Sequence, residues 1–178
     1  MILLGIITFV IVIFFTALTK VLVVGKVKQE ATEKAGRALY GGAGQGSENS
    51  LANEIRRMRF ISATSPTDIS STVINFVIDV DTISYIYSKN PYGSINKNNI
   101  LVRTINGANE QEISDCVSDF YFVYYTSMGW VIYTPVTDVD MIAKIGITLS
   151  IDYNKDNESD ATLKTTILPR NELLKALP

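Results

Sequence analysis

Histidine is absent from the 178-residue sequence, and cysteine occurs once, as Cys116. Without histidine, the chain lacks the commonest general base and the commonest metal ligand, and no Ser-His-Asp or Cys-His arrangement can form. A single cysteine cannot form an intrachain disulfide, and a lone cysteine is more often a small packed side chain than a nucleophile. We therefore expect a protein that is not an enzyme.

An excess of basic residues is also lacking. The chain has 16 lysine and arginine residues against 18 aspartate and glutamate residues, for a formal net charge of −2. A protein that follows a phosphate backbone needs a basic surface, so nucleic acid is not an expected partner. The length suits one globular domain with an appendage rather than two domains.

Charge is missing from the first nineteen residues, MILLGIITFVIVIFFTALT. The run from Ile2 to Thr19 is about as long as a helix must be to cross roughly 30 Å of hydrocarbon. It has no early lysine or arginine, and the apolar character continues after Lys20 through Val24, unlike a cleaved secretory signal. The sequence predicts a transmembrane or filament-core helix over residues 1–25.

Residues 26–63 are predicted to form an amphipathic helical region. Charged residues alternate with Val27, Ala31, Ala35 and Ala38 at helical spacing, so a helix from Ile2 to about Tyr40 would be roughly 58 Å long. The glycine-rich stretch GGAGQGS at 41–47 must interrupt it. A second helix is expected after an N-cap at Ser50, with one apolar face and a wet arginine face. The apolar face comprises Leu51, Ile55 and Met58, and the wet arginines are Arg56, Arg57 and Arg59.

Residues 64–178 change to a period of two, which predicts an antiparallel β-sheet domain. The expected strands are 73–80, 83–88, 100–105, 120–124, 130–133, 145–152 and 163–167. The first two should form a hairpin near Asp81, and Asn106-Gly107 should end the third. Strand 145–152 has one apolar and one polar face, which predicts a one-faced sheet covered by the amphipathic helix, an α+β fold.

This order of parts resembles the type IV pilin superfamily, which includes pilus (fimbrium) subunits and type II secretion pseudopilins. The more specific similarities are LANEIRRMRFISA (51–63), INFVIDVDTISYIYS (74–88), ISDCVSDFYFVYY (113–125), and ITLSID (147–152) followed by TLKTTILPRN (162–171). The resemblance implies a pilin-like fold, with a long N-terminal helix packed on the sheet. It also implies a filament subunit, as either a bulk or a minor pilin, whose partners are copies of itself or other pilins.

The resemblance further implies a precursor in the inner (cytoplasmic) membrane and a product in an extracellular, cell-surface filament, with a methylated N-terminus. The family usually has glutamate at the fifth position of the mature chain, but this position is Gly5, or Val10 if processing follows Gly5. Because neither residue is acidic, the usual charge pair between subunits would be missing. Met1 is either the initiator or a processed N-terminus.

The apolar helix is the expected assembly surface. Small and hydroxylated residues let helices approach closely, and the phenylalanines would fill gaps between subunits. The residues expected at this interface are Met1, Gly5, Thr8, Phe9, Phe14, Phe15, Thr16, Ala17 and Thr19. The alternative is a single-pass membrane-anchored, extracytoplasmic binding domain that does not polymerise, in which these side chains face lipid. Lys20, Lys26 and Lys28 follow the apolar run, and the positive-inside tendency would place them in the cytoplasm, opposite to a pilin.

Three further clusters are candidate sites. Asp152, Asn154 and Asp156 have the alternate spacing of a calcium loop, although a solvated hairpin loop fits the missing glycine and distal glutamate better. Asp115 and Asp119 could form an acid pair of the glycosidase kind, which would make the chain a membrane-tethered hydrolase. The aromatic residues Tyr121, Tyr124, Tyr125, Trp130 and Tyr133 predict cross-strand packing, with a binding surface as the alternative.

Overall fold

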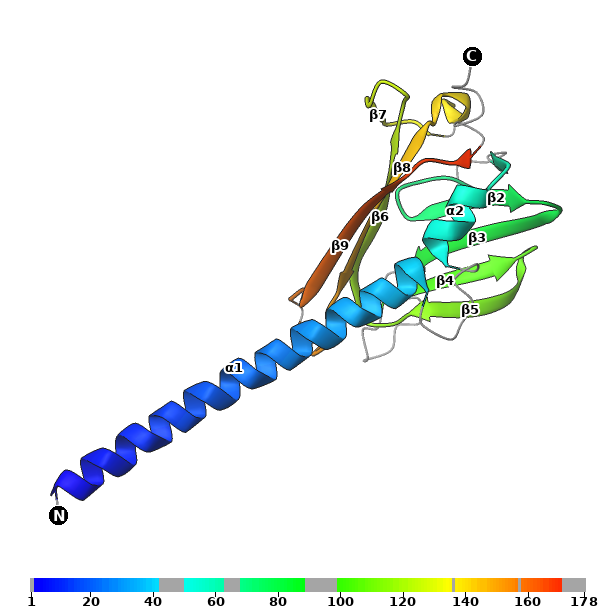
Figure 1. Cartoon of the computed structure of the whole chain (residues 1–178). Helices are drawn as coiled ribbons and strands as arrows, with labels where there is room; N and C mark the ends of the chain where they lie inside the picture. Colours follow the sequence, from blue (N-terminus) through cyan, green and yellow to red (C-terminus); the bar gives the residue numbers. More distant parts are fainter. Residues whose placement is uncertain are drawn as a thin grey trace.

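The fold is α+β, with one long N-terminal helix leaning on two antiparallel sheets (Figure 1). The computed structural model describes residues 2–41, 50–62, 68–88, 99–135, 137–156 and 158–170. Helix α1 (Ile2–Tyr40) has 39 residues, which confirms the predicted continuation through the charged half. Gly41 ends it with φ of +81° and donates its amide to the carbonyl of Arg37 at 2.8 Å. Glycine adopts this left-handed conformation without the cost that a Cβ atom would add.

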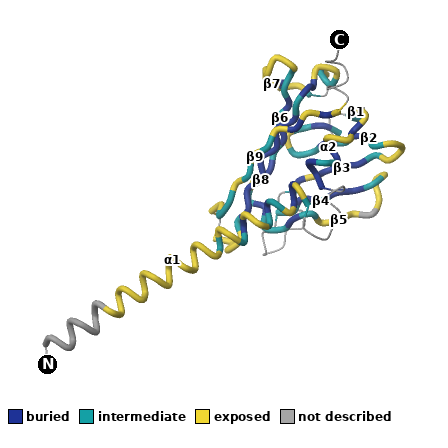
Figure 2. The backbone as a smooth tube through the Cα atoms, in the orientation of Figure 1, coloured by how far each residue is buried: buried dark blue, intermediate teal, exposed yellow. Residues whose placement is uncertain are grey.

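Helix α1 has two halves with different surroundings. The N-terminal half projects away from the sheets and is exposed over residues 11–26, whereas the C-terminal half lies against them (Figure 2). Ala31, Ala35, Ala38 and Leu39 are buried in the core of the domain. The alanines are small, so the helix backbone can lie close to strands of the sheets.

The larger sheet has five strands in the order β1-β2-β3-β4-β5. Its strands are β1 (Phe60–Ile61), β2 (Val73–Ile78), β3 (Asp81–Ser88), β4 (Ile100–Ile105) and β5 (Ala108–Ser114). The smaller sheet has the order β7-β6-β8-β9. Its strands are β6 (Val117–Tyr125), β7 (Val131–Ile132), β8 (Lys144–Ile151) and β9 (Ala161–Ile167), and a short 3-10 helix, η2 (Val139–Met141), precedes β8. All pairings are antiparallel.

Most of the predicted strands are present. The β2–β3 hairpin, strand β4 and the return of β9 along β8 are confirmed. The hairpin turn occupies Asp79 and Val80 instead of following them, and Asp79 has a positive φ of 55°. Val80 is consequently 90% exposed, so its predicted place in strand 73–80 is wrong. Strand β5 was not predicted because its sequence, ANEQEIS, has little apolar alternation.

The predicted wet face of β8 is wrong. Gly146, Thr148 and Ser150 are buried, as are the apolar residues that alternate with them. Strand β8 lies between β6 and β9, so larger side chains on both neighbours cover its small residues. Tyr125 would come within 3.0 Å of a Cβ atom at Gly146, and Ser150 hydrogen-bonds Thr162 at 2.8 Å.

Helix α2 (Leu51–Arg57) follows Ser50, whose extended backbone occupies the predicted N-cap position. Its predicted apolar face is confirmed, because Leu51, Ile55 and Met58 are buried. The predicted arginines are exposed. The helical region ends earlier than the predicted residue 63, because Phe60 and Ile61 form β1 by pairing with Val77 and Phe76 of β2.

Replacing Gly36→Ala is expected to stabilise the protein by about 0.5–1 kcal/mol. Gly36 lies within α1, and no atom outside the helix's own backbone approaches within 4 Å of an added Cβ. Alanine loses less backbone entropy than glycine in a helix. Urea unfolding of the full chain in detergent measures the gain. Gly107→Ala is the control, because that site is equally open but has φ of +70°, so alanine should destabilise it.

Candidate functional site

The most unusual surface of the molecule is the exposed half of α1, which we call the apolar segment and define as residues 11–24. All of its side chains are exposed, including Phe15 at 61%. Its large apolar members are Ile11, Val12, Ile13, Phe14, Phe15, Leu18, Val21, Leu22, Val23 and Val24. A contiguous apolar surface of this kind marks a protein-protein or membrane interaction site.

The predicted assembly residues fall on this segment or just before it. Phe14, Phe15, Thr16, Ala17 and Thr19 are exposed together on one helix. Gly5, Thr8 and Phe9 lie in α1, but their side chains and the whole of Met1 are outside the described residues.

Two threonines of the apolar segment have their hydroxyl groups satisfied within the helix. Thr16 donates to the carbonyl of Val12 at 2.7 Å, and Thr19 donates to that of Phe15 at 2.8 Å. A threonine bonded in this way can meet an apolar neighbour without burying an unpaired hydroxyl. Apart from Lys20, the segment can therefore pack against lipid or another helix.

Within the described part of the chain, no helix combines the length and the mean hydropathy expected of a membrane span.

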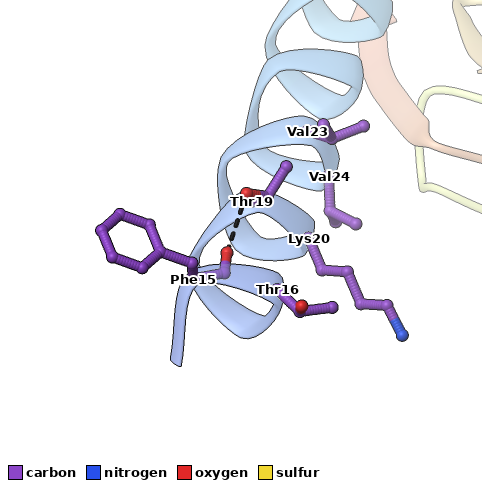
Figure 3. A pocket seen from close by; sticks show the side chains of 6 residues that line it. All are labelled: Phe15, Thr16, Thr19, Lys20, Val23 and Val24. Atoms are coloured by element: carbon purple, nitrogen blue, oxygen red, sulfur yellow. Dashed lines mark hydrogen bonds between the residues drawn. The ribbon is translucent and has the colours of Figure 1, made fainter. Parts of the chain in front are cut away.

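One side of the apolar segment carries a shallow pocket. It is lined by Phe15, Thr16, Thr19, Lys20, Val23 and Val24. Thr16, Lys20 and Val24 project to the same side of α1, whereas Phe15 projects to the opposite side (Figure 3).

Residues 30–34 of α1, which follow the apolar segment, make polar contacts with the domain. Lys34 forms an ion pair with Asp115, in the β5–β6 turn, and its Nζ lies 5.9 Å from the ring centre of Tyr153, in the β8–β9 loop. Partial burial lowers the pKa of Lys34, but Asp115 raises it more, so that the pKa is above its usual value. Burial alone would raise the pKa of Asp115, but Lys34 lowers it below its usual value. A general acid needs the opposite shift, so Asp115 does not suit the role of the acid in a pair with Asp119.

Asp115→Asn is expected to lower the free energy of unfolding by about 0.5 kcal/mol at pH 7, a small effect because both partners are partly exposed. The pKa of Asp115 is depressed, so its contribution is present at neutral pH and is lost as pH falls below about 4. The pKa of Lys34 is raised, so its contribution is lost only above about pH 10.5. The urea midpoints of wild type and Asp115→Asn should differ at pH 7 and converge at pH 3. Asp119→Asn is the control: Asp119 is exposed, so the midpoint of this variant should equal that of wild type at both pH values.

The predicted calcium residues lie together in the β8–β9 loop, where they bond one another and the backbone. The amide of Asp156 donates to Oδ1 of Asp152 at 3.2 Å and to Oδ1 of Asn154 at 3.1 Å. The amide of Tyr153 donates to Asp160 at 2.8 Å. Among the described residues, no group of three or more His, Cys, Asp or Glu is placed to hold a metal ion. Calcium at Asp152, Asn154 and Asp156 stays a prediction.

The predicted aromatic cluster divides into two groups. Tyr124 is buried and donates its hydroxyl to the carbonyl of Ser70 at 2.8 Å, and Tyr121 and Tyr125 are partly buried. Trp130 is 72% exposed and Tyr133 is 88% exposed, so the packing prediction is wrong for these two. Strand β7 has only two residues, and its flanking residues leave the sheet.

A buried charged cluster was missed by sequence reasoning. Glu54 of α2 is 3% exposed and accepts hydrogen bonds from Arg103 Nε at 2.9 Å and from the Tyr85 hydroxyl at 2.8 Å. Its carboxylate raises the pKa of Arg103, and burial together with Glu54 raises that of Tyr85. The sequence feature that could have indicated this cluster is the position of Glu54, which shares the apolar face of α2 with Leu51 and Ile55. The cluster joins α2 to β3 and β4.

No family model and no curated protein sequence matches the chain. The geometry of the apolar segment is therefore the basis for a functional proposal.

Proposed function

We propose that the chain is a structural subunit of a type IV pilus-like surface filament or pseudopilus and polymerises through α1. One observation carries this proposal: a fully exposed apolar helical segment projects from a domain with its own buried core. Burying one large apolar side chain is worth about 1.5–3 kcal/mol. Ten such side chains in one segment provide a strong drive for association.

The same surface suits two environments in turn. As a precursor in the inner (cytoplasmic) membrane, the apolar segment would be surrounded by lipid tails. In the extracellular filament, the segment would be surrounded by the helices of other subunits, which are either copies of this chain or other pilins. The α+β arrangement, with small residues of α1 against the sheets, is consistent with a pilin-like domain on the filament surface.

The second candidate is a single-pass membrane-anchored, extracytoplasmic domain that binds a ligand without polymerising. The exposed aromatic residues Trp130 and Tyr133 favour it, because they lie in the β7 region, at the end of the domain remote from the N-terminus of α1 (Figure 1). Exposed aromatic side chains are common where proteins bind partners. This candidate needs α1 only as an anchor.

The deciding experiment is intact mass measurement, with N-terminal fragmentation, of the chain recovered from filaments sheared from whole cells. An abundant chain with a methylated N-terminal amine supports the filament subunit. A chain found only in detergent-extracted membranes, with an unmethylated start, contradicts polymerisation and supports the anchored domain. A membrane protein known not to polymerise serves as the control for shearing damage.

A further inference from the structure

Lys20 is the only charged residue between Ile2 and Gly25, and it lies in the apolar segment. Its side chain is exposed, and it forms no ion pair with any residue that the structure describes. It projects from the same side of α1 as Thr16 and Val24 (Figure 3). When apolar helices pack around it, an unpaired ammonium group would be taken out of water at a large cost. Assembly through this face therefore requires a carboxylate opposite Lys20.

Glu30 is the suitable carboxylate on the same helix. Ten residues at 100° each place Glu30 about 80° around α1 from Lys20, so the two side chains face different neighbours when helices pack around α1. Ten residues of helix separate them by about 15 Å. The side chain of Glu30 is 36% exposed, and its Oε1 is 3.8 Å from Nζ of Lys26. Tyr153 also hydrogen-bonds this carboxylate, and the part of the Glu30 side chain that stays exposed is accessible to a second cation.

The surroundings of Glu30 extend this negative charge. Tyr153 of the β8–β9 loop lies against both Glu30 and Lys34. The loop and its flanks carry four carboxylates, on Asp152, Asp156, Glu158 and Asp160, and one lysine, Lys155. The β8–β9 loop beside Glu30 therefore carries a net negative charge, whereas Lys26 and Lys34 of α1 carry positive charge next to it.

We infer that Lys20 of one copy forms an ion pair with Glu30 of a second, parallel copy displaced by about 15 Å along the helix axis. This inference rests on the proposed function. The contact joins two different patches, so it is heterologous, and repeating it gives an open filament instead of a closed dimer.

Charge reversal tests the pair in cells that assemble the wild-type chain. Lys20→Glu and Glu30→Lys are each expected to lower the amount of sheared filament at least tenfold, because like charges then meet. The double variant should restore assembly to within about twofold of wild type. Lys28→Glu is the matched control, because Lys28 is exposed on α1 but lies about 160° around the helix from Glu30, and it should leave assembly unchanged. Because Glu30→Lys also alters the contact with Lys26, its melting temperature is compared with that of wild type.

Carbodiimide cross-linking provides a direct readout, because it joins only amines and carboxylates that are in contact. Filaments of mixed ¹⁴N- and ¹⁵N-labelled chains should yield a Lys20–Glu30 peptide in which one half carries each label. Cross-links of Lys20 solely to other carboxylates, or a Lys20→Glu variant that assembles as well as wild type, would overturn the pairing and leave the proposed function intact. Loss of the Lys20→Glu variant from membranes before assembly would instead assign Lys20 to lipid headgroups. Absence of wild-type filaments would contradict the proposed function itself.

Discussion

Removal of the Glu54 carboxylate is expected to destabilise the protein by about 3–5 kcal/mol. In Glu54→Ala, the guanidinium of Arg103 and the hydroxyl of Tyr85 both lose their acceptor, and both residues are buried. A buried cation without a partner costs far more than the net worth of the pair. The variant should therefore unfold at a much lower urea concentration than wild type.

Urea unfolding of the full chain in detergent, followed by circular dichroism, measures this loss. The matched control is Glu112→Ala, because Glu112 is an exposed glutamate on β5 and should change the free energy of unfolding by less than about 0.5 kcal/mol. Equal urea midpoints for the Glu54 and Glu112 variants would contradict the buried cluster.

The apolar replacement of the whole cluster should behave differently. A triple variant, Glu54→Leu with Arg103→Met and Tyr85→Phe, removes the charges and hydroxyl together and leaves no unpaired group. Such replacements are often neutral or stabilising. We expect the triple variant to recover most of the stability that Glu54→Ala loses. Such a recovery would show that the cluster fixes the position of α2 and adds little net stability.

The helices and most strands were predictable because their signals are local. The change from helical spacing to a period of two separates α1 and α2 from the sheets, and Gly41 ends α1 within the glycine-rich stretch. Burial on the second face of β8 was not predictable, because it depends on Tyr125 of β6 and Thr162 of β9 as neighbours. A strand's own alternation does not reveal which strands will flank it.

The candidate site was predictable to a similar degree. The apolar segment is visible as an uncharged run, and its exposure follows from the projection of α1 beyond the domain. Lys34 and Asp115, which form an ion pair, are 81 positions apart in the sequence (115 − 34 = 81). No local sequence pattern predicts this contact. The same holds for Glu54 and Arg103, which are 49 positions apart.

Enlarging the buried alanine at position 35 is expected to displace the C-terminal half of α1 from the sheets. Ala35 is completely buried in the core, and α1 contacts β8 and β9. Leucine adds three carbon atoms where the packing has no space, and overpacking of this kind costs about 1–3 kcal/mol. The sheets keep their own hydrogen bonds, so the damage should concentrate at the interface with α1.

Hydrogen exchange of the full chain in detergent distinguishes local from global loss. In Ala35→Leu, amides of residues 31–39 should exchange faster than in wild type, while those of β6 and β8 keep their protection. Thr32→Leu is the control, because Thr32 is on the exposed side of the same helix turn and leucine favours helix. Faster exchange in Thr32→Leu as well would mean that the helix itself had been weakened. Unchanged exchange in Ala35→Leu would mean that the sheets do not hold α1 in place.

Because α1 couples the domain to the apolar segment, displacement of its C-terminal half should also reduce filament yield without altering the association surface itself.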